Sequence, residues 1–185
     1  GGEGTVAISI GGLVGSVNDA QTTIEQCLTE GNINGLTTMA QVGGLVGWFD
    51  GTSKTVMSTI KDCYSLMDVS GTSTSDKKGT GGLVGRVGIY TTISNSYAVG
   101  KVTGTSNVGA IIGYSPESTS TVSNIFYSKT LSGQTSGVVG VAKSTYAMTK
   151  QATYTGWDFE SVWGIDETKS MAYLRVFGVP DKLYD

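Results

Sequence analysis

Short apolar blocks, bounded by glycine or asparagine, recur along this chain. The first is Gly-Gly-Leu-Val-Gly at 11–15, which returns at 43–47 and 81–85 and, in weaker form, at 109–113 and 136–140. The last glycines of these copies are 32, 38, 28 and 27 residues apart. Each block is long enough for one strand, but none can bury an apolar face alone. The pattern therefore predicts units that stack on one another.

Two further blocks follow the first one in each unit. One begins as Ile24-Glu25-Gln26-Cys27-Leu28, and the other reads Gly-Asn-Ile-Asn-Gly at 31–35 and loses its pattern in the fourth unit. Three strand-forming blocks per unit predict an all-β fold, a parallel β-solenoid of about 4–5 coils that are stacked about 4.8 Å apart. Because parallel strands almost always connect with right-handed crossovers, we expect a right-handed β-helix. A β-sandwich is the rival, but it has no reason to repeat residue types at equivalent places.

Equivalent positions in these blocks predict columns that run from coil to coil. Two interior columns are expected: Ile24, Ile60, Ile93 and Val122; and Ile33, Val69 and Val102. A polar column, in which amides can pair between coils, is expected at a corner: Gln26, Asp62, Asn95 and Asn124. A mostly aromatic column follows two residues later: Leu28, Tyr64, Tyr97 and Phe126. Insertions should form loops between blocks, and the two longest are at 48–59 and 72–80.

The two ends of the chain differ from the repeats between them. Gly4-Thr5-Val6-Ala7 matches the third block, so we expect the chain to begin within a coil and to be part of a longer parent protein. Residues 144–185 hold 8 of the 16 aromatic residues. We expect residues 1–143 to form the solenoid and 144–185 to form a cap across its open end, within one structural unit. Residues 144–153 should begin with a capped helical turn.

Composition excludes several classes of function. The chain has no His, which rules out Ser-His-Asp and Cys-His nucleophilic sites and zinc sites that need imidazole. The formal net charge of −3 and the lack of a basic stripe argue against a nucleic-acid partner. No apolar run is long enough for a transmembrane segment. Phosphate-loop, dinucleotide and calcium-repeat patterns are missing and the acids are scattered, so we expect no cofactor, no metal, no catalytic residues and no enzyme activity.

Variable aromatic and charged residues follow the glycine-rich blocks and are candidates for ligand contacts on loops over a rigid scaffold. The candidate ligand-binding residues are Trp48, Phe49, Asp50, Arg86, Tyr90 and Tyr114. An alternative is that Trp48 and Phe49 fold back onto the coil. The valine and isoleucine stripe that starts at Val14 could face outward, lie under loops or form an assembly face.

Cys27 and Cys63 occupy equivalent positions in neighbouring units. Their expected separation allows a disulfide. Side chains at equivalent positions point the same way, however, and Ser96 and Ile125 fill the same column in later units. We therefore favour free, buried thiols over a disulfide.

The glycine-rich block, together with Ile-Ser-Asn-Ser-Tyr-Ala-Val-Gly-Lys-Val-Thr-Gly at 93–104, resembles the GLUG-motif repeat. The resemblance covers about 4–142 and is closest at 81–109, and the tail from Gly156 is similar to segments that close such arrays. GLUG repeats occur in bacterial surface proteins, including adhesins and the non-catalytic part of some immunoglobulin A peptidases.

The resemblance implies an extracellular or cell-surface protein with no catalytic residues to carry over. We therefore expect a non-catalytic adhesion or binding module with a host glycan or protein as partner. The alternatives are a glycan-active enzyme on a β-helix and a ligand-free structural stalk of a larger protein.

Overall fold

The computed structural model describes residues 7–19, 21–116, 120–135 and 139–179. It is a parallel β-solenoid of four turns, which confirms the predicted fold class. The strands form three stacked sheets. The first sheet contains the strands that lead into the Gly-Gly-Leu-Val-Gly turns: β1 (Ile8–Gly11), β5 (Ala40–Gly43), β9 (Thr80–Gly81) and β13 (Val108–Gly109).

The other two sheets complete each coil. The second sheet contains β2 (Val14–Val17), β6 (Val46–Phe49), β10 (Val84–Val87) and β14 (Ile112–Tyr114). The third sheet is bent: its strands before and at the bend are β3 (Thr23–Glu25), β7 (Ser58–Lys61), β11 (Thr91–Ala98) and β15 (Thr121–Ser128). The strands after the bend are β4 (Leu28–Gly35), β8 (Tyr64–Gly71), β12 (Val102–Gly104) and β16 (Val141–Lys143).

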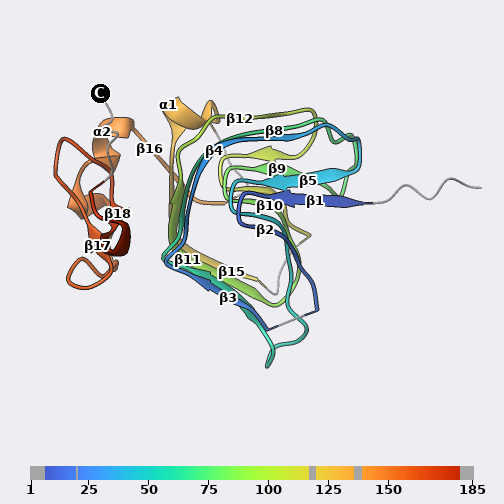
Figure 1. The fold of residues 1–185 in the computed structure, drawn as a ribbon, viewed down its shortest axis with the longest axis horizontal. Coiled ribbons are helices and arrows are strands. Elements are labelled where there is room, and N and C mark those ends of the chain that lie inside the picture. Colours follow the sequence, from blue (N-terminus) through green and yellow to red (C-terminus); the bar gives the residue numbers. More distant parts are fainter. Residues whose placement is uncertain (1–6, 20, 117–119, 136–138, 180–185) are drawn as a thin grey trace, which may run out of the picture.

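The first two sheets lie within the bend of the third, and glycine allows their close approach (Figure 1). A Cβ atom on Gly85 of β10 would lie 2.6 Å from the backbone nitrogen of Val42 on β5, and one on Gly47 would lie 2.5 Å from that of Ile10. Only glycine fits between backbones at such distances. The repeated glycines therefore create two core compartments, one on each side of this double layer.

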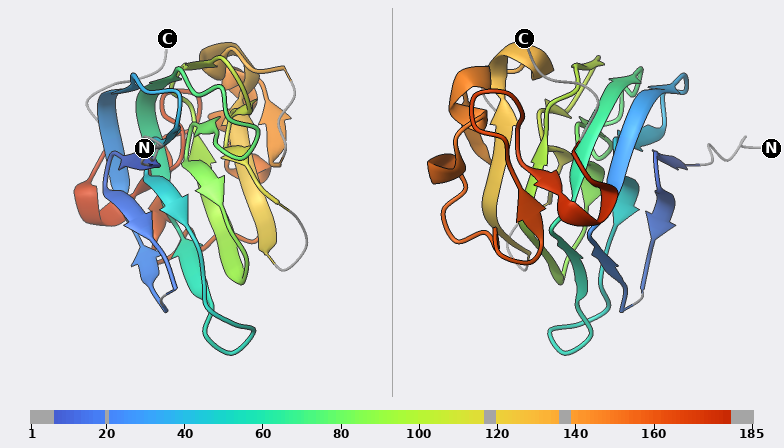
Figure 2. Two further views of the ribbon diagram at one scale, coloured as in Figure 1. Left: turned by 90° about the vertical axis from the view of Figure 1, so that its right-hand side faces the viewer. Right: turned by 60° about the vertical axis from the view of Figure 1, so that its left-hand side comes forward.

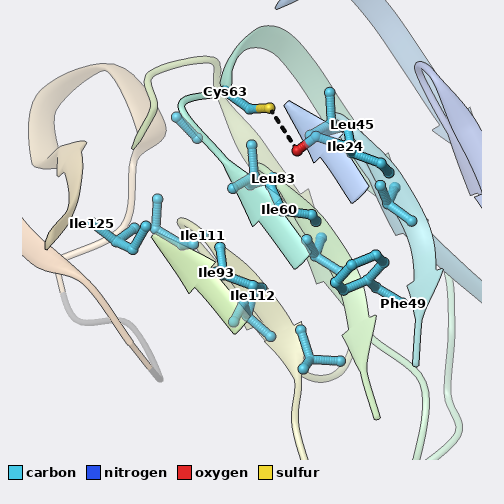
Figure 3. Packing of buried hydrophobic residues seen from close by; sticks show 14 of the residues in the cluster. Ile24, Leu45, Phe49, Ile60, Cys63, Leu83, Ile93, Ile111, Ile112 and Ile125 are labelled. Atoms are coloured by element: carbon cyan, nitrogen blue, oxygen red, sulfur yellow. Dashed lines mark hydrogen bonds between the residues drawn. The ribbon is translucent and has the colours of Figure 1, made fainter. Parts of the chain in front are cut away.

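The interior columns have the register that the repeats predict. Ile24 pairs with Ile60, Ile60 with Ile93, and Ile93 with Val122. Leu45, Leu83 and Ile111, from the tips of the glycine-rich turns, are buried in the same cluster (Figure 3). The Val14 stripe also faces this core, because its members Val46 and Val84 are fully buried. The alternative that this stripe faces outward and forms an assembly surface is therefore wrong.

The polar column forms the corner between the two halves of the third sheet. Gln26, Asp62, Asn95 and Asn124 all have φ values between 46° and 52°, the left-handed region that Asn and Asp tolerate better than most residues. The Asn124 side-chain amide donates a hydrogen bond to Asn95 Oδ1 at 3.1 Å. The predicted amide pairing between coils is thus present at this step.

Residues 144–179 pack against the side of the solenoid, beyond its corner (Figure 1). They contain α2 (Thr145–Met148), the 3₁₀ turns 151–153 and 175–177, and the short antiparallel pair β17 (Trp163–Gly164) and β18 (Tyr173–Leu174). Ser144 Oγ accepts a hydrogen bond from the Ala147 amide, so the predicted capped turn is confirmed. This segment shares one buried cluster with Tyr64, Tyr97 and Phe126, which come from three successive coils.

The expected position of this segment across an open end of the solenoid is therefore wrong. The aromatic column packs against residues 144–179. This segment runs along the side of the stack (Figure 2). At the first coil, Ile8 and Leu13 remain 38% and 48% exposed. At the fourth coil, β16 pairs with Phe126–Ser128 of β15, and α1 (Lys129–Ser132) precedes it.

Two sequence predictions fall on residues outside the described ranges. The match of Gly4-Thr5-Val6-Ala7 to the third block includes residues 4–6, and the fifth glycine-rich copy includes 136–138. Val139 does pack against the core cluster. The strand that follows, Val141–Lys143, adds to the third sheet instead of continuing the second.

Candidate binding surface

Three candidate residues form a row on the second sheet. The register aligns Ser16, Trp48, Arg86 and Tyr114 on β2, β6, β10 and β14, so that these residues occupy successive coils. Trp48, Arg86 and Tyr114 are each partly exposed. The Arg86 guanidinium carbon lies 4.9 Å from the centre of the Trp48 ring and 5.9 Å from that of Tyr114. The cation therefore lies within cation–π range of both rings.

Lys78 joins this row from the loop that precedes β9. Its ammonium nitrogen lies 5.6 Å from the centre of the Trp48 ring, and the residue is only 7% exposed. Burial, followed by the positive charge of Arg86, lowers the pKa of Lys78 below its ordinary value. Sequence reasoning missed this residue, because the length of the 72–80 insertion does not show where its end is anchored.

Asn107 holds this loop in place. Its side-chain amide donates to the carbonyl oxygens of Ser75, Asp76 and Lys78 at 3.3, 3.0 and 2.8 Å. Gly79 completes the anchor, since a Cβ atom there would lie 2.5 Å from the Gly113 carbonyl carbon. The loop thus reaches the neighbouring coil by backbone contact and side-chain hydrogen bonds, which fix the position of Lys78.

The remaining three candidates lie outside the row. Phe49 is fully buried in the core, among the residues drawn in Figure 3, and offers nothing to a ligand. Asp50 Oδ1 accepts hydrogen bonds from the backbone amides of Gly51 and Ile89, at 3.0 and 2.7 Å, and so fixes the turn between β10 and β11. Tyr90 lies in that turn with a φ of 53°, and its carbonyl accepts from the Ser58 amide. The alternative that the aromatic pair folds back onto the coil holds for Phe49, whereas Trp48 stays partly exposed.

Both cysteines are free thiols. Cys63 is buried and its Sγ lies 3.2 Å from the Lys61 carbonyl oxygen and 3.6 Å from that of Ile24 (Figure 3). Burial raises the pKa of Cys63 to about 12. Cys27 is only half-buried and its Sγ lies 3.2 Å from the Glu25 carbonyl oxygen. Cys63 alone is fully buried, whereas the free, buried state was expected of both thiols.

The most deeply buried carboxylate, that of Asp62, has a structural role. Asp62 Oδ1 accepts a hydrogen bond from Trp163 Nε1 at 3.1 Å, and Oδ2 lies 3.3 Å from the Lys61 ammonium. The Trp163 bond links the corner column to residues 144–179. Across the described ranges, no three His, Cys, Asp or Glu side chains are grouped as a metal ion would require.

Comparison with known proteins finds a family motif and a similar sequence. Residues 78–103 match the GLUG motif, which confirms the resemblance and places the match on the third coil. The chain is 35% identical, over 115 residues, to a protein of Evansella cellulosilytica that is provisionally named a Gly-rich membrane protein. That alignment covers 59% of the chain and 13% of the relative.

A solved structure has a similar fold. It is the crystal structure of a Bacteroides ovatus protein provisionally described as an immunoglobulin A1 protease. The TM-score is 0.55 at 22% identity, and the similarity covers 83% of this chain and 57% of that one. At this level of sequence identity, the similarity shows a shared fold only. In the described part of the chain, no helix has the length and apolar character needed to cross a bilayer.

Proposed function

We propose that this chain is a non-catalytic binding module of a bacterial surface protein and that Trp48, Arg86 and Tyr114 form its contact surface. The observation that carries the proposal is the alignment of these three side chains on successive strands of a rigid sheet. Partly exposed tryptophan, arginine and tyrosine are the residue types that dominate binding energy at interfaces. The GLUG match and the relative named as a membrane protein support a location at the cell surface.

The structural roles of two acids support a binding function over glycan cleavage. Hydrolysis of a glycosidic bond needs a pair of carboxylates that can reach the substrate. Asp62 is 2% exposed and bonded to Trp163, and Asp50 accepts two backbone hydrogen bonds. These two residues therefore maintain the fold and are not a free carboxylate pair.

The test is binding of the purified chain to an array of glycans and host proteins, followed by titration of each ligand found. We expect Trp48→Ala and Tyr114→Ala to weaken binding about tenfold or more. Tyr146→Ala is the matched control, because Tyr146 is an exposed aromatic residue on α2, at 68% exposure, away from the row. Circular dichroism would verify that each variant is folded.

Three results would contradict the proposal. Equal binding by all variants would place the ligand elsewhere on the molecule. The absence of any ligand for the folded chain would favour a structural stalk. Release of sugar fragments from a bound glycan would favour an enzyme.

A further inference from the structure

Two cations lie at one ring and, among the described residues, neither has an anionic partner. Lys78 and Arg86 both lie within 5.6 Å of the centre of the Trp48 ring. The salt bridges in the described ranges involve Lys61, Lys150 and Lys169 and include neither of these cations. Trp48 Nε1 and Arg86 Nε are buried and likewise have no hydrogen-bond acceptor among the described residues. Hydrogen-bond donors of Trp48 and Arg86 thus lie close together at this ring without acceptors among the described residues.

This arrangement is costly in the free protein. Burying a charge is unfavourable unless it is paired, and two like charges close together add repulsion. Lys78 is nonetheless held there by its backbone, because Asn107 fixes the carbonyl oxygens of the loop and Gly79 packs against the next coil. A long lysine side chain could otherwise extend into water. The fold therefore maintains a positive pair that a bound anion would neutralise.

We propose that Trp48, Lys78 and Arg86 bind an anionic group, a carboxylate or sulfate, on a sugar ligand. This inference rests on the proposed binding function and gives its ligand a chemical class. The guanidinium and ammonium groups supply N–H donors, which form stronger hydrogen bonds with an oxyanion than neutral donors do. This local positive charge occurs in a chain whose formal net charge is −3, so attraction of an anion depends on local charge and not on the net charge of the chain.

A sugar, and not an acidic peptide, is favoured by the neighbours of Trp48. Both cations come from the third coil, whereas the first coil contributes only Ser16 to the row. The small hydroxyl side chain of Ser16 covers little of the indole and can itself form hydrogen bonds. An aromatic surface beside hydroxyl and cationic groups suits a ligand that has an apolar ring face, hydroxyl groups and one negative charge.

The first experiment measures the response to inorganic sulfate in the full chain. We compare the melting temperature in sulfate with that in chloride at equal ionic strength, for the unmodified chain and for Lys78→Met, Arg86→Gln and Lys77→Gln. Lys77 is the exposed neighbour of Lys78, so Lys77→Gln makes a similar change in charge outside the site. General salt effects of sulfate act on all four proteins and cancel in the comparison.

The expected result has two parts. Sulfate should raise the melting temperature of the unmodified chain and Lys77→Gln more than that of Lys78→Met and Arg86→Gln. In chloride, Lys78→Met should melt above the unmodified chain, because it removes a largely buried charge that lies beside the like charge of Arg86. An equal sulfate response in all four proteins, or a lower melting temperature of Lys78→Met together with an unchanged sulfate response, would overturn the inference.

A second experiment uses sugars that share lactose and differ in the acidic group attached to it. Lactose, 3′-sialyllactose and 3′-sulfolactose carry no acidic group, a carboxylate-bearing residue and a sulfate, respectively. We expect an acidic sugar to bind the chain about tenfold or more tightly than lactose and to lose this preference in Lys78→Met. The two acidic sugars separate carboxylate from sulfate recognition.

The two proposals fail in different ways. Array ligands that bind through Trp48 without any preference for charge would overturn the anionic class and leave the binding function standing. A sulfate response that depends on Lys78 in a chain that binds no array ligand would support the anion site and contradict the proposed function.

Discussion

At the scale of single residues, burial gives ordinary side chains unusual acid–base behaviour. Cys63 lies in the core beneath the corner of the third sheet, where an ionised thiolate would lose its hydration. Its pKa is therefore raised from the ordinary value of 9.0 to about 12, and the pKa of Tyr64 on the other side of the sheet is raised from 10.0 to about 12 mainly by burial. Neither group is suited to act as a nucleophile at neutral pH.

The raised thiol pKa predicts a loss of stability in alkali. Between pH 9 and about 12 the unfolded chain releases the Cys63 proton while the folded chain retains it, so the free energy of unfolding falls as the pH rises. Cys63→Ser should reduce this slope by about 1.4 kcal/mol per pH unit. Serine occupies the equivalent position at Ser96, where its hydroxyl donates to the Ser94 carbonyl, so the variant should fold normally.

Urea unfolding at several pH values would measure this slope. Well below pH 9 the two proteins should show the same dependence on pH, since the thiol is protonated in both the folded and unfolded states. Parallel curves for the two proteins above pH 9 would show that Cys63 does not titrate differently on unfolding.

At the scale of the coil, the second glycine of each Gly-Gly-Leu-Val-Gly turn faces the carbonyl oxygen of the next coil. A Cβ atom on Gly12, Gly44 or Gly82 would lie 2.1–2.3 Å from the oxygen of the equivalent residue one coil later. Ala110 takes this place in the fourth coil, the last one that has a Gly-Gly-Leu-Val-Gly-type turn within the described residues. The step from glycine to alanine therefore coincides with the end of this part of the stack.

This contact predicts unequal effects of two reciprocal substitutions. Gly82→Ala should lower the free energy of unfolding by about 3 kcal/mol or more, because its methyl group would collide with the Ala110 carbonyl and force the coils apart. Ala110→Gly should cost about 1 kcal/mol, mainly through the greater freedom of glycine in the unfolded chain. Urea denaturation gives both values, and a similar cost for the two variants would argue against the collision.

Coil-scale features were predictable from the sequence to a large extent, because stacking places equivalent residues in columns. The register of Ile24, Ile60 and Ile93 and the amide pair of Asn95 and Asn124 follow directly from the repeat. The residues after the glycine-rich blocks vary between units, so the repeat leaves open whether Phe49 lies on the surface or in the core, where the structure places it. Nor does it place Lys78, whose loop has no equivalent of the same length in the next coil.

At the scale of the whole molecule, residues 144–179 and the solenoid share one buried aromatic cluster. Trp163 is fully buried, its ring centre lies 4.4 Å from that of Trp157 and 6.0 Å from that of Tyr64, and its Nε1 donates to Asp62. Tyr97 adds a second polar link, since its hydroxyl donates to the Ala172 carbonyl at 2.6 Å. The segment is not periodic, so its position along the side of the solenoid depends on these contacts and could not be predicted from the repeats.

Such a shared cluster predicts that the solenoid and residues 144–179 unfold together. Trp163→Ala should lower the free energy of unfolding by about 3–5 kcal/mol, since it leaves a cavity between the two parts and removes the hydrogen bond to Asp62. Trp163→Phe retains an aromatic ring and should lower the free energy of unfolding by less than Trp163→Ala does. A similar loss in both variants would show that the position tolerates no change, whatever the packing. The loss of β-sheet circular dichroism and the change in tryptophan fluorescence should coincide during urea unfolding of every variant. Two separate transitions, with the sheet signal unchanged by Trp163→Ala, would instead show that residues 144–179 are an independent unit resting on the solenoid.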